Sequence, residues 1–410
     1  MRDFQEEYNV FESALEIPEP WYVFHHELAK SEKTLHIYLE YRKGAVFTCP
    51  NCGTSGCKVH DIQDQNRSWR HLDFWQYQTL LHARMPRVKC ESCGKIRTVV
   101  IDWARPGAGF SLLFEYHVLS LMVDMPVAAV ARKVGEHDTR LWRVFKHYVD
   151  QAVAKIDVSN IKSIAMDETS RTRGHKYVTI FVDTDTKRVI FVTIGKGADV
   201  LKEFCLFLDS KGVPHSQIKE FCCDMSPSFI AGIETNFPEA SITFDKFHVM
   251  KMVNEALDKV RRQEQSTQPE LKHSRYVWLK NKENLTEKQK KKFAKLKDLD
   301  LATGRAYRMK LALQKMFTHS AGIASLYFDD WYSWAIRSQL EPMIKLAQSL
   351  QKHRDGILRW FRTKMTNGLL EGINSLVQAA KRKARGYRSP DNFIAMIYAT
   401  VNKMDLILEP

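Results

Sequence analysis

The chain has 410 residues, of which 44% are hydrophobic and 27% are charged. This length allows two to four domains with cores of their own, and the composition excludes disordered and fibrous proteins. Lys and Arg number 62 against 48 Asp and Glu, which gives a formal net charge of +14. The excess favours a polyanionic partner, nucleic acid first and an anionic membrane surface second. The alternative is a basic soluble protein without such a partner.

No apolar run approaches the roughly 18 residues that a membrane helix requires. The N-terminal segment is acidic and lacks the basic-then-apolar order of a signal peptide. We therefore expect a cytoplasmic protein without a membrane partner. In that reducing compartment, the cysteines gathered between residues 49 and 93 indicate a metal site rather than disulfides.

The first expected strand, at residues 35–39, leads into two Cys-x-x-Cys-Gly motifs, and a β-hairpin is expected around residues 69–83 between them. Two residues between thiolates let both sulfurs face one ion, and the following glycine allows a positive φ. Two such motifs predict a closed, structural zinc site. Its expected ligands are Cys49, Cys52, Cys90 and Cys93, while Cys57 and His60 are alternative or second-site ligands.

Three helices are expected next, at residues 111–124, 126–134 and 137–153, with Gly135 at the turn before the third. Their spacing is typical of a helix-turn-helix, in which the third helix would enter the DNA major groove. The alternative is a plain three-helix packing unit. The expected DNA contacts on the third helix include Arg140, Arg143 and Lys146.

From residue 161 the apolar period changes to two, which indicates strands. The expected order is three strands, a helix, a strand, a helix and a strand, and this predicts a mixed sheet with helices on its faces. Those elements are expected at 161–167, 177–183, 189–194, 200–208, 218–224, 228–236 and 241–245. Residues 246–365 read as helical throughout, and 366–380 as one more amphipathic helix before a basic tail.

Two acids close expected strands, Asp167 the first and Asp224 the fourth. Carboxylates at neighbouring strand ends repel one another unless a cation lies between them, and hard oxygen ligands select Mg²⁺ or Mn²⁺. A third acid is expected from a distant helix, where Asn367, Glu371 and Asn374 form one polar stripe. The alternative reading of that stripe is a solvated helix face. Glu168, Asp183 and Asp185 are rival acids, and a turn better explains the last two.

These residues resemble the ribonuclease-H-like DDE transposases, and in particular the ISL3 family of bacterial insertion-sequence transposases. The resemblance covers nearly the whole chain and lies in the two cysteine motifs, the helix-turn-helix, Asp224-Met225-Ser226, Asp245-Lys246-Phe247-His248, Glu371-Gly372-x-Asn374 and the basic segment 381–387. It implies a multidomain α/β fold: an N-terminal zinc-binding module, a helix-turn-helix and a ribonuclease-H-like mixed sheet with an all-helical insertion. The expected boundaries are 1–105 for the zinc-binding domain, 106–157 for the helix-turn-helix, 158–248 for the first part of the catalytic core, 249–362 for the insertion and 363–410 for the catalytic helix and basic tail.

The resemblance implies that Asp167, Asp224 and Glu371 form a triad holding two Mg²⁺ or Mn²⁺ ions for DNA strand cleavage and strand transfer. It also implies that His248 lies near the scissile phosphate or a metal-bound water; a packed histidine at a helix start is the equal alternative. The expected partners are the terminal inverted repeats and target DNA, with a homodimer holding both ends. The phosphate contacts expected from the C-terminal tail are Lys381, Arg382, Lys383, Arg385 and Arg388.

Three competing functions remain. A catalytically silent DNA-binding repressor descended from a transposase is the first, and a structure-selective nuclease of the same fold is the second. A membrane-surface protein is the weakest, because the basic residues do not gather opposite an apolar helical face. For the favoured function, the expected location is the bacterial cytoplasm, in association with the nucleoid.

Overall fold

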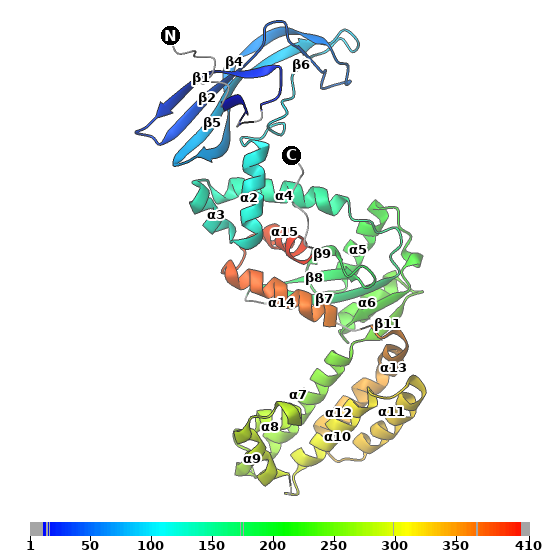
Figure 1. The fold of residues 1–410 in the computed structure, drawn as a ribbon. Helices are drawn as coiled ribbons and strands as arrows, with labels where there is room; N and C mark the ends of the chain where they lie inside the picture. The colour runs from blue at the N-terminus through cyan, green and yellow to red at the C-terminus, as the bar shows by residue number, and fades with distance from the viewer. Residues whose placement is uncertain are drawn as a thin grey trace. The chain divides into compact units, whose positions relative to one another are not determined.

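The computed structural model describes residues 11–402 apart from 14, 16, 173, 175, 298, 366 and 367 (Figure 1). The described residues form two compact units, one ending at Val149 and the other beginning at Asp150. The predicted zinc-binding and helix-turn-helix segments lie in the first unit. The predicted catalytic core, insertion and C-terminal segment lie in the second.

A six-stranded sheet forms the start of the first unit. Its strands are β1 (Trp21–Ala29), β2 (Thr34–Tyr41), β3 (Val46–Phe47), β4 (Cys57–Phe74), β5 (Tyr77–Lys89) and β6 (Ile96–Thr98), in the order β1-β2-β5-β4-β3 with β6 paired to β5. The β4–β5 hairpin contains the hairpin predicted around residues 69–83. Alternate side chains of β2 and β5 face a core that holds Leu35, Ile37, Leu81 and two tryptophans, Trp21 and Trp103.

The three predicted helices of this unit are confirmed to within one residue at either end. They are α2 (Leu112–Asp124), α3 (Val127–Val134) and α4 (Asp138–Ala154), the last of which runs on into the second unit. Ser111 caps α2 by accepting a hydrogen bond from the Phe114 amide, and Gly135 ends α3 with a φ of 69°. Nδ1 of His71 on β4 lies 2.8 Å from the Ser111 hydroxyl, so the helices are attached to the sheet.

A five-stranded mixed sheet forms the centre of the second unit. Its strands are β7 (Ser163–Thr172), β8 (Lys176–Asp183), β9 (Val189–Ile194), β10 (Glu220–Cys223) and β11 (Ser241–Phe244), in the order β11-β10-β7-β8-β9. β10 is parallel to both β7 and β11, and the β7–β8–β9 meander is antiparallel. The core on one face contains Met166 of β7 together with Phe204 and Phe229 of helices α5 (Asp199–Ser210) and α6 (Pro227–Asn236). The mixed sheet is therefore as predicted.

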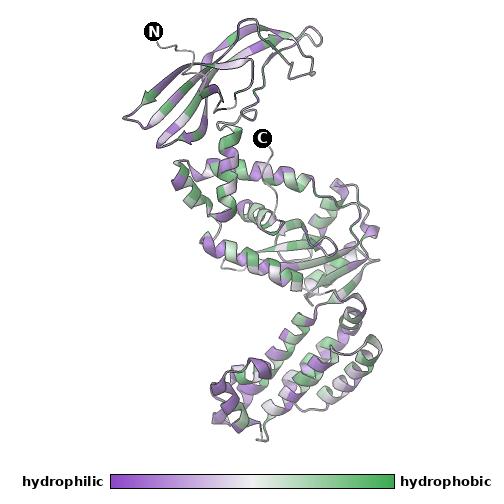
Figure 2. Ribbon diagram, viewed as in Figure 1, coloured by the Kyte–Doolittle hydropathy of each residue, from purple (hydrophilic) through white to green (hydrophobic). Residues whose placement is uncertain are grey.

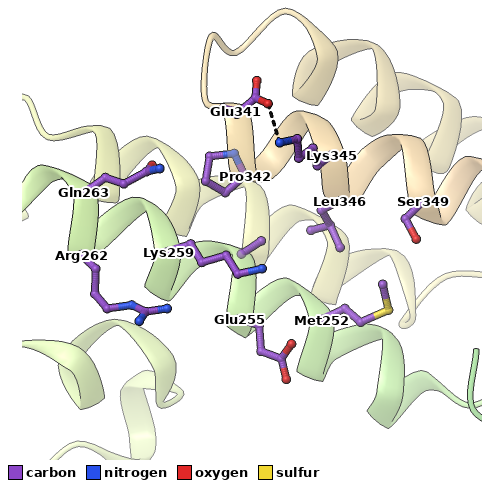
Figure 3. Close-up of a pocket in the computed structure, with 11 residues that line it drawn as sticks. Met252, Glu255, Lys259, Arg262, Gln263, Glu341, Pro342, Lys345, Leu346 and Ser349 are labelled. Carbon is purple, nitrogen blue, oxygen red and sulfur yellow. Dashed lines mark ion pairs between the residues drawn. The ribbon is translucent and has the colours of Figure 1, made fainter. Parts of the chain in front are cut away.

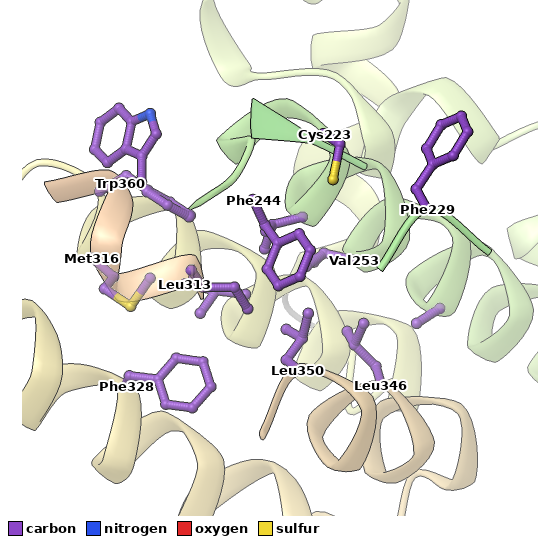
Figure 4. Close-up of a cluster of buried hydrophobic side chains, with 14 of the residues drawn as sticks. Cys223, Phe229, Phe244, Val253, Leu313, Met316, Phe328, Leu346, Leu350 and Trp360 are labelled. Atoms are coloured by element: carbon purple, nitrogen blue, oxygen red, sulfur yellow. The ribbon is translucent and has the colours of Figure 1, made fainter. Parts of the chain in front are cut away.

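The all-helical insertion follows β11 directly. Its helices are α7 (Lys246–Glu264), α8 (Arg275–Leu279), α9 (Glu287–Leu296), α10 (Ala302–Met316), α11 (Ala321–Ile336), α12 (Glu341–Lys352) and α13 (Arg354–Thr363). The insertion and the sheet share one hydrophobic core, because Phe244 of β11 packs with Leu350 of α12 and Trp360 of α13 (Figure 4). Hydrophilic residues are dense over α8 and α9 (Figure 2), in keeping with the lysines of that segment.

Two helices end the described chain, α14 (Gly368–Lys383) and α15 (Pro390–Val401). The prediction of α14 is confirmed, but α15 was missed, since only a basic tail was expected there. Ser389 caps α15 by accepting from the Asn392 amide, and the Asn402 side chain bonds both backbone groups of Val189 on β9. Within the described part of the chain, no helix is long and apolar enough to cross a membrane.

Candidate active site

Three aspartates lie in one row across neighbouring parallel strands. Cys222 of β10 pairs with Ala165 of β7, and continuing this register by two residues places Asp224 opposite Asp167. Cys223 pairs with Phe244 of β11, so the next residue along places Asp245 opposite Asp224. Because in-register side chains of parallel strands face the same side of a sheet, the row forms one acidic edge at the carboxyl ends of β10 and β11.

Asp167 was predicted to end its strand, and this prediction is wrong. β7 runs on to Thr172, because its antiparallel pairing with β8 continues as far as Lys176 after the parallel pairing with β10 has ended. The carboxylate nevertheless lies where β7 loses its parallel neighbour. It is half-buried, and burial is the largest cause that raises its pKa; the charge of Asp224 raises the pKa further.

His248 faces this acidic edge from the first turn of α7. Asp245 caps that helix by accepting from the Phe247 amide, and its Oδ2 lies 3.5 Å from Nδ1 of His248. The pKa of His248 is raised, first by Asp245 and then by the charges of Asp167 and Asp224, against the opposing effect of burial. The histidine thus interacts electrostatically with the acidic edge, and its role stays a prediction.

Helix α14 is bonded directly to β7. Nδ2 of Asn374 donates to Oδ2 of Asp167 at 2.8 Å, and one turn later Nε2 of Gln378 donates to the Thr169 hydroxyl at 2.7 Å. Nζ of Lys381 donates to the Ser170 carbonyl at 2.6 Å. Asn374 was predicted to share a face with Glu371, but its bond to Asp167 was missed. The side chains at 374, 378 and 381 do follow a helical stripe that sequence periodicity can detect.

Glu371 is exposed on α14, one turn before Asn374. Among the described residues, no group of three His, Cys, Asp or Glu outside the cysteine cluster has ligand atoms that all lie within 4.8 Å. The structure therefore brings the helix of Glu371 to Asp167, but does not bring the three predicted ligands into one coordination sphere. Asn367, the first residue of the predicted stripe, lies outside the described residues.

The rival acids are placed differently. Asp183 is buried, and its carboxylate accepts from the Asp185 and Thr186 amides, so the turn explains it as predicted. Glu168 is half-buried beside Asp167, and its pKa is raised by burial and by Asp224, against the lowering effect of Lys196 and Lys251. Glu168 thus remains the rival third carboxylate.

The four predicted zinc ligands converge. All their sulfurs lie within 4.8 Å of one another, with Cys49 3.8 Å from Cys93 and Cys52 3.5 Å from Cys90. The two motifs fold alike, because the amides of Gly53 and Gly94 each donate to the carbonyl of the first cysteine at 2.9 Å, with φ values of 76° and 68°. This donor set fits a tetrahedral zinc ion with no open position.

Cys57 and His60 stand outside this sulfur cluster. Cys57 is buried and its thiol donates to the Thr54 carbonyl at 3.5 Å, whereas Nδ1 of His60 lies 2.9 Å from a carboxylate oxygen of Asp61. Neither is needed to complete the four ligands.

The predicted DNA contacts of α4 differ in exposure. Arg143 is exposed and Lys146 is half-buried. Arg140 is paired with Glu136 at 2.6 Å, and its guanidinium lies 4.2 Å from the centre of the Phe110 ring. Of the three, Arg143 is thus the side chain most available to a ligand.

The C-terminal basic residues also separate into two groups. Arg382, Lys383, Arg385 and Arg388 are exposed, whereas Lys381 is half-buried against β7, and burial lowers its pKa. Arg171 on β7 donates to the backbone carbonyls of Tyr387 and Arg388, at 3.4 Å and 3.1 Å. The backbone that carries Arg388 is thus held beside the strand of Asp167.

A hollow of about 600 Å³ lies along α7 and α12 in the insertion (Figure 3). Its lining includes Lys259 and Arg262 of α7, with Lys345 of α12 paired to Glu341 at 2.8 Å. It holds none of the residues of the acidic edge, so it is a feature of the insertion rather than the catalytic pocket.

The comparisons with known proteins agree with this arrangement. A family model described as "Transposase" of the ISL3 type matches residues 164–397, more than half of the chain. The chain belongs to the ISL3 family of transposases. It is a DNA-cutting and joining enzyme. Models for the helix-turn-helix domain of transposase family ISL3 and for the zinc-finger of related transposases match residues 99–149 and 45–93.

Curated relatives of this ISL3 transposase have similar lengths. The chain is 30% identical over 396 residues to the transposase for insertion sequence element IS1557 of Mycobacterium tuberculosis, covering 88% of this chain and 87% of the relative. It is 28% identical over 378 residues to the transposase for insertion sequence element IS1001 of Bordetella parapertussis, covering 90% and 91%. The family and the cysteine cluster together support structural zinc, and the family implies a divalent metal.

Proposed function

We propose that this ISL3 transposase binds the terminal inverted repeats of its insertion sequence and cuts and joins DNA with Mg²⁺ or Mn²⁺. Asp167, Asp224 and Glu371 would hold two such ions. The observation that carries the proposal is the row of Asp167 and Asp224 in register on parallel strands, with α14 bonded to Asp167 through Asn374. The charge of Asp224 contributes to the raised pKa of Asp167, and a cation between the two carboxylates removes that repulsion.

Glu371 joins the site in this proposal by the movement of one side chain. It shares a helix face with Asn374, whose amide already contacts Asp167. Its carboxylate is exposed and has no bonded partner among the described residues, so binding of a cation can draw it in. His248 is oriented by Asp245 at the same edge, in reach of a phosphate or of a bound water.

Divalent ions held by these carboxylates would activate the nucleophile and stabilise the leaving oxygen of an in-line displacement. In the first step water attacks the phosphorus at the element's end, and the P–O bond to the 3′ oxygen breaks. In the second, the freed 3′-hydroxyl attacks a target phosphodiester, so one P–O bond replaces another. Through both steps Asn374 keeps the Asp167 carboxylate in place.

DNA binding would be divided between the two units. We assign the terminal repeats to the zinc module and to α4, with Arg143 as the most exposed contact. The exposed residues Arg382, Lys383, Arg385 and Arg388 would bind phosphate near the active site, and the hollow of Lys259 and Arg262 would bind it along the insertion. We further propose a homodimer, since two ends must be cut together, working on the bacterial nucleoid in the cytoplasm.

The test is strand cleavage of a labelled duplex that carries the DNA flanking this gene, titrated with Mg²⁺ and separately with Mn²⁺. We expect metal-dependent cutting at the repeat boundary that is lost in Glu371→Gln and retained in Asp185→Asn, the matched acid in a turn. Cutting that survives Glu371→Gln but not Glu168→Gln would assign the third carboxylate to Glu168. Tight binding without cutting at any metal concentration would identify a repressor, and preference for branched DNA would identify a structure-selective nuclease.

A further inference from the structure

The tip of the β4–β5 hairpin carries an exposed tryptophan. Trp75 is 81% exposed, more than any other large hydrophobic side chain of the described residues. An isolated exposed apolar residue is common, but here the exposed ring of Phe74, which is 39% exposed, stacks on Trp75 with centroids 4.7 Å apart. The tip thus presents two adjoining aromatic rings to solvent in a strongly basic protein.

The backbone at Trp75 is unusual for its residue type. Trp75 and Gln76 form the two-residue turn between Phe74 and Tyr77, and Trp75 has a φ of 56°. Glycine is the ordinary residue at a turn position with positive φ, because a side chain there is strained. Strained positions of this kind cluster at binding sites, where the side chain is needed outside the fold.

The hairpin tip lies beside the turn of the helix-turn-helix. Nε2 of Gln78, at the start of β5, stands 2.5 Å from the position that a Cβ on Gly135 would occupy. Gly135 ends α3, and α4 begins three residues later at Asp138. The tip therefore lies next to the turn that leads into α4, beside the surface that the helix-turn-helix would offer to DNA.

The charge around the tip suits a phosphate backbone. The amide of Gln78 donates to the carbonyl of Lys33, which brings the turn of Lys30 and Lys33 next to the hairpin. Both lysines are exposed, as are Arg132 and Lys133 on the last turn of α3. Of the neighbouring acids that the structure describes, Asp73 is paired with Arg70 and Glu136 with Arg140, and Glu32 belongs to the lysine turn itself.

We propose that Trp75 inserts into duplex DNA at a base step beside the segment read by α4. This inference rests on the proposed binding of terminal repeats and adds to it a second contact, which works by stacking rather than by charge. Apolar side chains inserted in the minor groove unstack a base step and bend the duplex. Lys30, Lys33, Arg132 and Lys133 would hold the phosphates on either side.

The first test compares DNA affinity over a range of salt concentrations, with the full-length protein and the labelled duplex that flanks this gene. Stacking releases no counterions, so Trp75→Ala should weaken binding about fivefold or more at every salt concentration and leave the slope of log K against log salt unchanged. Trp75→Phe should keep most of the affinity. Lys133→Ala should instead reduce the slope by about one.

Phe24→Ala is the matched control, because Phe24 is an aromatic residue on β1 that is 47% exposed and far along the strand from the lysine turn. It should bind DNA as the wild type does. An affinity of Trp75→Ala within twofold of wild type would overturn the proposal while leaving terminal-repeat binding intact. Failure of the wild type itself to bind the duplex would overturn the proposed function instead.

The second test locates the insertion. 2-Aminopurine placed at successive positions of the duplex brightens when its neighbours unstack, and we expect brightening at one or two adjacent positions with wild type and none with Trp75→Ala. Brightening that persists in Trp75→Ala would overturn the assignment. A loss of the dimer mass in Trp75→Ala by light scattering, with DNA affinity unchanged, would show that the ring contacts a second copy of the chain.

Discussion

Asn374 and Asp167 are 207 positions apart in the chain, and yet the amide of one donates to the carboxylate of the other at 2.8 Å. Among the side-chain bonds that join the helix of Glu371 to β7, this is the one that reaches the Asp167 carboxylate. Oδ2 of Asp167 accepts this bond and Oδ1 accepts from the Glu168 amide at 2.8 Å, so the carboxylate has a defined orientation for holding a metal ion.

Replacing Asn374 with Ala should therefore reduce cleavage without abolishing it. Partners that orient a metal ligand typically contribute about 10- to 100-fold in metal affinity or activity. We expect the Mg²⁺ concentration for half-maximal cleavage to rise by about that factor, with DNA affinity unchanged. Gln378→Ala, which removes the neighbouring bond to Thr169, is the control and should change the Mg²⁺ requirement little. Equal effects of the two variants would mean that both residues only attach α14 to the sheet.

Removing one predicted zinc ligand should release the metal. Cys52→Ser leaves three of the four converging sulfurs, so we expect bound zinc, measured by elemental analysis, to fall from about one per chain to near zero. Terminal-repeat binding should be lost with it. Cys57→Ser removes a buried thiol outside the cluster and should keep the zinc. Zinc retained in Cys52→Ser and lost in Cys57→Ser would reverse the ligand assignment.

The link between sheet and helices in the first unit should weaken in acid. Burial, and then the charge of Arg70, lowers the pKa of His71 from 6.5 to about 4. The unfolded state therefore binds a proton between pH 6.5 and pH 4 that the folded state does not, so stability falls as the pH falls through this window. The slope should reach up to ~1.4 kcal/mol per pH unit in urea unfolding and flatten in His71→Asn. An equal slope in the variant would place the acid sensitivity elsewhere.

The buried ion pair between α2 and the preceding loop should be essential for the first unit. Glu115 is fully buried, accepts two bonds from Arg105 at 2.6 Å and 2.7 Å, and accepts another from the Tyr148 hydroxyl of α4 at 2.6 Å. Breaking such a pair on one side typically costs about 3–5 kcal/mol, since a buried charge is left without its partner. Arg105→Ala leaves the buried Glu115 carboxylate without its ion-pair partner and should therefore lower the free energy of unfolding by that amount, while Arg140→Ala, at the half-buried pair with Glu136, should lower it by much less.

The elements with a clear apolar period were predicted closely. Strands β7, β8 and β9 and helices α2 to α6 start and end within five residues of their predicted bounds, because their buried faces repeat every two or 3.6 residues. The helix α15 was missed although Ser389-Pro390 is a strong helix start, because the charged segment before it was read as continuing to the end of the chain. Its partner, β9, lies about 200 residues away.

The candidate site, too, was predicted only in part. The types of Asp167, Asp224 and Glu371 and their order were visible in the sequence. Their register was not, because strand neighbours are set by tertiary pairing. Periodicity placed Asn374 on the face of Glu371, but only the packing of α14 on β7 selects Asp167 as its partner. Likewise the two cysteine motifs predicted four ligands, and the fold brings those four sulfurs together.

The insertion begins and ends on the same strand edge, and this limits how it can move. The chain leaves β11 at Asp245 into α7 and returns through α13, where Gly356 lies so near Phe244 that a Cβ would stand 2.5 Å from the ring. Arg359 also donates to the Ile242 carbonyl of β11. Because both ends of the insertion are attached to β11, it cannot rotate freely about a single hinge. A force on its outer helices is therefore transmitted to Asp245, which caps α7. Tension in DNA bound by the insertion would thus act on the position of Asp245 in the acidic edge before any bond is cut.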